Sequence, residues 1–214
     1  MIQRTNKVLF GYWNDVRGDR IAPRRFDIEP SQIASILAET FILECPEDHA
    51  RYEFRLAGTK ICEQFGWEFR GIDFRHLWSD RDADTLLLTM ADTLPRGGVV
   101  TIDFEAAGLG SDKSARFEAI LLPLVHTTDK VSRVLGAISA ITGDGCLGAE
   151  RLGKAQLSAT HITWPDGRPH AIADKFREPA PLLASVTGAR IVRFNRRSFR
   201  VVEGGLGRED DAKT

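Results

Sequence analysis

The chain has 214 residues, of which 43% are hydrophobic and 28% charged, and its net charge is −1. This composition is typical of one globular domain with a tail, and it excludes collagen-like, low-complexity and wholly disordered chains. The small net charge excludes a global field that would draw the molecule to nucleic acid or to anionic lipid. No apolar run approaches the roughly 18 residues of a membrane-spanning helix. The first residues lack a secretory cleavage site, so a cytoplasmic protein is expected.

The distribution of charge divides the chain near residue 143. Residues 1–143 carry 17 Lys and Arg against 21 Asp and Glu, whereas residues 144–214 carry 12 against 9. A boundary within 143–145 therefore separates an acidic body from a basic C-terminal extension. Within the body we expect an N-terminal amphipathic helix over 1–18 and the main domain over 19–143.

Apolar residues recur at helical spacing from Thr5 onwards, which predicts an amphipathic helix that ends at about Gly18. Its apolar stripe consists of Val8, Leu9, Tyr12, Trp13 and Val16. Because the helix precedes the main domain, we expect a second copy of the chain to cover this stripe, which makes the protein a homodimer. In the alternative arrangement, the helix folds back on its own sheet.

The rest of the body predicts alternating groups of helices and strands. In chain order these are a short helix from Pro30, strands over 40–45 and 52–56, short helical pieces over 58–78, a longer helix over 80–94, and strands over 99–106, 115–125 and 134–141. The last three strands follow one another through turns, which predicts an antiparallel meander. A single helical insertion gives too few crossovers for a parallel sheet, so the fold class is α+β.

A set of spaced motifs extends over residues 8–142. The motifs are Tyr12-Trp13, Arg17-Gly18, Ala22-Pro23-Arg24-Arg25, Asp27-Ile28-Glu29-Pro30, Phe54-Arg55-Leu56-Ala57-Gly58-Thr59, Phe65-Gly66, Arg70-Gly71, Phe74, Leu77-Trp78, Leu122-Pro123-Leu124 and Leu135-Gly136-Ala137. Together they resemble a bacterial family of short, stand-alone PAS-domain proteins. The resemblance implies a PAS-like five-stranded antiparallel sheet in the order 2-1-5-4-3, with short helices on one face. It also implies a non-enzymatic sensory or protein-interaction module, whose partner would be an unidentified signalling protein.

Many PAS relatives hold a cofactor, but the residues present here argue against flavin and haem. Flavin-binding photosensors carry a reactive Cys in an Asn-Cys-Arg-Phe-Leu-Gln motif, whereas Cys62 lies in a different context and is expected to pack as a core residue. His76 is the one candidate haem ligand, and it is expected to lie at the surface. The spacing of the three cysteines fits neither a disulfide framework nor a metal site, so no metal is expected.

Five large aromatic side chains gather between the second strand and the long helix. They are Phe65, Trp67, Phe69, Phe74 and Trp78. Large aromatic residues over a twisted sheet ordinarily fill a core. In the alternative, they line a pocket between the sheet and these helices, and the protein is a small-molecule receptor.

No motif predicts catalysis. Asp80, Asp82 and Asp84 lie at the start of a predicted helix, where carboxylates favour the helix dipole rather than acid–base chemistry. The chain contains no nucleophile elbow, Walker A motif or dinucleotide fingerprint. We therefore expect no catalytic residue.

The C-terminal extension contains an arginine cluster made of Arg190, Arg193, Arg196, Arg197 and Arg200. The spacing from Arg193 to Arg197 is similar to the first half of the PilZ signature, but the second half is absent, which excludes a PilZ domain. We expect a strand-like segment over 190–202 whose arginines are solvated, or else bind an acidic protein or a small anionic ligand. No helix-turn-helix pattern accompanies the charges, which argues against nucleic acid.

Overall fold

The structure is a computed structural model, and it describes residues 1–45, 51–126, 130–143 and 145–170. In chain order its elements are α1 (Arg4–Arg17), the 3₁₀ helices η1 (Arg25–Asp27) and η2 (Pro30–Glu39), β1 (Thr40–Glu44), β2 (Glu53–Ala57), α2 (Thr59–Phe65), η3 (Phe74–Leu77), α3 (Asp80–Thr93), η4 (Leu94–Arg96), β3 (Val99–Ala107), β4 (Ser114–Val125), β5 (Val131–Gly143) and β6 (Gln156–Thr163). The helices and strands predicted for the body form close to their expected ranges. Among the described residues, no helix combines the length and the apolar character needed to span a bilayer. The arginine cluster and the predicted strand over 190–202 lie outside the described residues.

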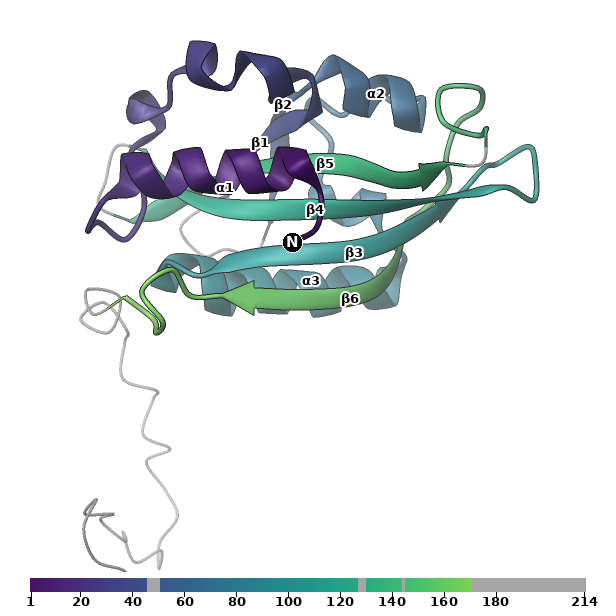
Figure 1. The fold of residues 1–214 in the computed structure, drawn as a ribbon. Coiled ribbons are helices and arrows are strands. Elements are labelled where there is room, and N and C mark those ends of the chain that lie inside the picture. The colour runs from purple at the N-terminus through teal and green to yellow at the C-terminus, as the bar shows by residue number, and fades with distance from the viewer. Residues whose placement is uncertain (46–50, 127–129, 144, 171–214) are drawn as a thin grey trace, which may run out of the picture. The chain divides into compact units, whose positions relative to one another are not determined.

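Six strands form one antiparallel sheet in the order β2-β1-β5-β4-β3-β6 (Figure 1). The first five strands confirm the α+β class and the order 2-1-5-4-3. The sixth strand was not expected, because β6 lies in the stretch that its charge assigned to the C-terminal extension. It pairs with β3 from Val99 opposite Thr163 to Glu105 opposite Gln156. The sheet therefore takes up the first part of that extension.

One face of the sheet is covered by α2, η3 and α3, as predicted. A continuous core of buried side chains fills the space between this face and the helices. Helix α3 begins at its N-cap Ser79, whose hydroxyl accepts a hydrogen bond from the amide of Asp82, and it buries Leu86 and Met90. Trp78 is also buried in this core, which confirms that large aromatic residues lie inside the fold on this face.

Helix α1 and η2 cover the opposite face, so the sheet has helices on both sides (Figure 1). Leu9 and Trp13 are fully buried in the second core, together with Leu122 and Leu124 of β4. The indole Nε1 of Trp13 donates a hydrogen bond to the carbonyl of Pro123 at 2.8 Å. The expectation that a second copy covers Leu9 and Trp13 is therefore wrong, because strand β4 of the same chain already covers them.

The remaining residues of the α1 stripe lie at the margin of this contact. Tyr12 and Val16 are half-buried, and Val8 is exposed. The Tyr12 hydroxyl accepts a hydrogen bond from the amide of Glu29 at 2.8 Å, so it holds the start of η2. The helix thus folds back on its own sheet. Homodimerisation stays a prediction, for which Val8, Tyr12 and Val16 retain some accessible surface.

Candidate functional site

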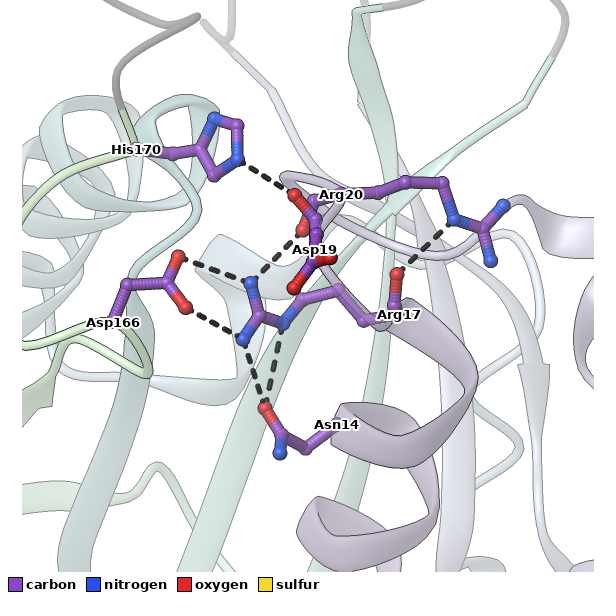
Figure 2. A network of polar contacts seen from close by, with 6 residues as sticks. All are labelled: Asn14, Arg17, Asp19, Arg20, Asp166 and His170. Atoms are coloured by element: carbon purple, nitrogen blue, oxygen red, sulfur yellow. Dashed lines mark hydrogen bonds and ion pairs between the residues drawn. The ribbon is translucent and has the colours of Figure 1, made fainter.

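Arg17 and Asp166 join the end of α1 to the chain that follows β6 (Figure 2). The Arg17 guanidinium is buried and donates two hydrogen bonds to the Asp166 carboxylate, at 2.9 and 3.1 Å. It also lies over the ring of Trp13, 5.6 Å from the centroid. The hydrogen bonds from Arg17 hold the pKa of Asp166 below its usual range, so the pair is charged at neutral pH. We call this pair the clasp.

Further acceptors around the clasp bind the other N–H groups of the Arg17 guanidinium (Figure 2). The guanidinium donates to the side-chain oxygen of Asn14 at 3.1 Å and to the carbonyl of Arg20 at 2.9 Å. Close by, the ring of His170 bonds the carbonyl of Asp19 at 3.1 Å. A buried guanidinium needs this many acceptors because an unpaired charge inside a protein is costly. The clasp therefore positions both the loop after α1 and the chain up to residue 170.

Glu118 of β4 anchors the residues that precede α1. Its buried carboxylate accepts hydrogen bonds from the amides of Ile2 and Gln3, at 2.6 and 2.9 Å, and from the side chain of Asn6 at 2.9 Å. Negative charge is favoured near the N-terminus of a helix. Burial raises the pKa of Glu118, but the hydrogen bonds together outweigh burial and hold the pKa below its usual range.

Replacing Glu118 by glutamine is expected to flatten the dependence of stability on acid pH. Because the pKa is lower in the folded state than in the unfolded state, the unfolded chain takes up the proton first as the pH falls. The stabilisation is complete above the unfolded pKa and is lost as the pH falls through the folded pKa. Urea unfolding between about pH 7 and pH 3 should show a shallower loss in Glu118→Gln than in wild type, and a deficit of about 1–3 kcal/mol at neutral pH.

The control for this measurement is Glu63→Gln, which changes an exposed carboxylate on α2. This variant should follow the wild-type profile at every pH. Parallel profiles for Glu118→Gln and wild type would contradict the anchoring role of Glu118.

Four of the five aromatic residues that were candidates for a core or, alternatively, a ligand pocket lie in the first core, where they form two contacting pairs. Phe65 lies 5.5 Å from Phe69, and Phe74 lies 5.5 Å from Trp78, between ring centroids. Phe65 also stacks on Phe117 of β4 at 4.9 Å. These distances are typical of packed aromatic pairs. The contacts favour the core interpretation over the pocket interpretation for this face of the sheet.

Trp67, the fifth of these aromatic residues, lies at the rim of the same core. It is half-buried, and its indole nitrogen donates to the carbonyl of Leu152 at 2.9 Å. The guanidinium of Arg151 lies 4.5 Å from its ring centroid, which is cation–π geometry. Trp67 therefore holds the segment between β5 and β6 against α2.

The cysteine and histidine side chains considered as ligands of a cofactor or a metal lie in different parts of the fold. Cys62 is half-buried on α2 and packs against the first core, whereas His76 is exposed on η3. Burial raises the pKa of the Cys45 thiol to about 12, so this cysteine stays protonated and unreactive. Within the ranges that the structure describes, no three His, Cys, Asp or Glu side chains are grouped as metal ligands.

The three aspartates at the start of α3 each contact a different group. Asp80 pairs with Lys154 at 2.9 Å, Asp84 pairs with Arg75 at 2.7 Å, and Asp82 accepts a hydrogen bond from the amide of Leu157 at 3.1 Å. These contacts fasten α3 to β6 and to its surroundings. They do not form the opposed carboxylates that acid–base catalysis needs.

An open apolar groove of about 520 Å³ lies between η2 and the side of the sheet formed by β1 and β2. Its apolar lining includes Ile33, Leu37, Ile42, Leu56 and Leu135, and Arg25 also lines it. Its lining comes from residues 25–59 together with Leu135 of β5. The sequence predictions missed the groove because the strand pairing that sets Leu56, Ile42 and Leu135 side by side is not visible in the spacing along the chain. The signal available was the apolar face of the helix that begins at Pro30, where Ile33 is buried and Leu37 is exposed.

Comparisons with known proteins give one family and one solved structure. A family model described as a PAS domain matches residues 1–139. The LOV protein of Rhodobacter sphaeroides is 16% identical in sequence, and the structural match covers 55% of this chain and 71% of that chain with a TM-score of 0.39. A search of curated proteins found no match.

Proposed function

The chain belongs to the PAS domain family, and from this premise we propose that it is a non-enzymatic regulatory module that signals by non-covalent association with another protein chain. The family relationship supports a sensory or regulatory role. The proposal adds that the output is a change in association rather than a chemical reaction. The associated chain is a signalling protein or a second copy of this one.

The observation that carries the proposal is the clasp. It ties α1, which lies on one face of the sheet, to the chain that follows β6 at the sheet edge (Figure 2). A displacement of α1 therefore breaks or shifts the contacts of Asp166. If the clasp has two discrete arrangements, a change at α1 is coupled to the chain that follows β6.

Two further features of the chain support the proposal. Cys45, Cys62 and Cys146 are free thiols, which suits the reducing conditions of the cytoplasm. Residues 190–200 contain the arginine cluster, which we propose as the contact for an acidic partner or a small anionic ligand.

Replacing Asp166 by asparagine is expected to open the clasp without unfolding the sheet. The buried Arg17 guanidinium then loses a charged acceptor, so the amides of 164–170 and of 17–20 should exchange hydrogen about tenfold faster or more. Affinity purification from the source cells should be run with wild type and with Asp166→Asn as baits. The amounts of the proteins recovered should differ several-fold between the two baits. Native mass spectrometry of the same samples would report oligomeric state and bound small molecules.

Asp84→Asn is the matched control, because it also removes an Arg–Asp pair, at an exposed position on α3. It should leave both the exchange rates around Arg17 and the recovered proteins unchanged. Recovery that is identical for all three proteins, or a homogeneous monomer that associates with nothing, would contradict the proposed function.

A further inference from the structure

The floor of the groove is a row of apolar side chains that crosses three paired strands. Leu56 of β2 lies opposite Ile42 of β1, and Ile42 lies opposite Leu135 of β5. Residues directly opposite one another in a sheet share a face. Their exposed fractions fall from 45% at Leu56 through 9% at Ile42 to 2% at Leu135. The floor is therefore accessible to solvent at the β2 edge and covered toward the middle of the sheet. The groove thus has an open end at β2 and a closed end at β5.

The wall formed by η2 is held at both ends, so the groove is formed before anything binds. At its start, the amide of Glu29 bonds the Tyr12 hydroxyl of α1 at 2.8 Å. At its end, the Glu39 carboxylate accepts hydrogen bonds from Thr5, Lys60 and Ser139. A preformed apolar cavity lowers the entropic cost of binding a ligand.

Gly58 closes the groove at the junction of η2 and α2. A Cβ atom at this position would lie 2.2 Å from the carbonyl oxygen of Ala38, so only glycine permits the approach of the two segments. Gly58 and Thr59 of this junction line the groove. The groove therefore has a fixed end as well as fixed walls.

Arg25 contributes a positive charge to this otherwise apolar lining. Its side chain is half-buried, and in the part of the chain that the structure describes it has no hydrogen bond and no ion pair. The η1 turn that carries it is held by the hydrogen bond from the Arg24 amide to Asp27, at 3.0 Å, and by the Arg20–Asp27 ion pair. A guanidinium held in place without an anion is suited to a carboxylate.

Paired charged side chains lie next to the floor of the groove. One step along the strands from Ile42 and Leu135, on the same face, Glu44 lies opposite Arg133. Glu44 also pairs with Arg55 at 3.0 Å, and Arg55 lies 4.0 Å from Glu53, so the two guanidiniums of this row are matched by two carboxylates. Arg24, which precedes Arg25 on the chain, bridges to Val125 of β4. Arg25 is the charged residue among those that line the groove, so the groove combines an apolar floor with one positive charge that is not paired with a described carboxylate.

We propose that this groove binds an amphiphilic monoanion, namely an unbranched acyl chain that bears a carboxylate. The chain lies on Leu56, Ile42 and Leu135 beneath η2, and the carboxylate pairs with Arg25. This site lies on the face of the sheet opposite the aromatic core. The further idea that this ligand modulates association rests on the proposed regulatory function. Binding itself requires only the folded chain, so failure of this proposal leaves the Asp166→Asn test standing.

The experiment compares decanoate with decanol, which has the same chain and no charge. Isothermal titration should give tighter binding of decanoate to the full chain. Arg25→Gln should raise the Kd for decanoate about tenfold or more, because a charge-assisted pair is lost, and should leave the Kd for decanol unchanged. Ala34→Phe, which adds a ring to an exposed position on the wall of the groove, should weaken both ligands.

Arg116→Gln is the matched control, because Arg116 is an exposed arginine on β4 that forms no ion pair with any described residue. This variant should bind both ligands as wild type does. Methyl shifts in NMR spectra should be largest at Ile42 and Leu56. Equal binding of decanoate and decanol, no effect of Arg25→Gln, or shifts centred on Ile61 and Leu86 of the aromatic core would overturn the proposal. A dimer that decanoate does not dissociate and that protects Leu56 would show instead that the groove is an interface between copies.

Discussion

Trp13→Ala is expected to lower the free energy of unfolding by about 3–5 kcal/mol. The side chain is fully buried and packs on strand β4 of its own chain. Truncation removes the indole donor to the Pro123 carbonyl, the ring beneath Arg17 and the contact with Phe10 at 6.2 Å. The loss is measured by urea unfolding at neutral pH, and sedimentation of the same samples reports the oligomeric state.

Tyr12→Phe is the control for Trp13→Ala, because the two residues are neighbours on α1. It removes only the hydroxyl that accepts the amide of Glu29, and it should cost about 0.5–1.5 kcal/mol. A Trp13→Ala variant that dissociates a dimer, while leaving the stability of the monomer unchanged, would place Trp13 between subunits after all.

Phe65→Ala should also cost about 3–5 kcal/mol of unfolding free energy. The ring is fully buried at the centre of the aromatic core, where it contacts Phe69, Phe104 and Phe117. The neighbours come from β3, β4 and the loop after α2 and cannot all collapse into the space that is left, so a cavity remains. Thermal and urea unfolding both measure the loss.

Phe26→Ala is the control for Phe65→Ala, because it removes a phenyl ring whose side chain is 73% exposed. Its effect on stability should stay within about 0.5 kcal/mol. A small effect of Phe65→Ala, together with loss of a co-purified small molecule, would favour the ligand-pocket interpretation of these aromatic residues.

The strands and helices of the body were predictable because their apolar periodicity is strong. The prediction that a second copy covers the apolar stripe of α1 was wrong for Leu9 and Trp13, although the sequence of β4 contained the relevant signal. The segment over 115–125 is an almost continuous apolar run, and such a run is typical of a strand that is buried on both faces. Helices on a single face cannot bury both sides of β4. The second face needed a cover, and the stripe with Leu9 and Trp13 supplies it.

Strand β6 and the groove were not predicted, for different physical reasons. All eight residues of β6 are partly or fully exposed, so its sequence has weak apolar alternation, and its pairing with β3 depends on tertiary context. The groove depends on strand register, which sets Leu56 beside Ile42, and on the turn that carries Arg25. Neither neighbour relationship is visible in local spacing along the chain.

The distance along the chain between α1 and its cover affects how the protein is made. The hydrogen bond between Trp13 and Pro123 joins residues 110 positions apart. Helix formation takes about a microsecond, whereas a ribosome adding about 5–20 residues per second needs roughly 5–20 s to make the intervening segment. During that interval the nascent chain presents Leu9 and Trp13 to solvent on a helix with no sheet beneath it. Newly synthesised chains are therefore most exposed to aggregation, and to capture by chaperones, before β4 has emerged.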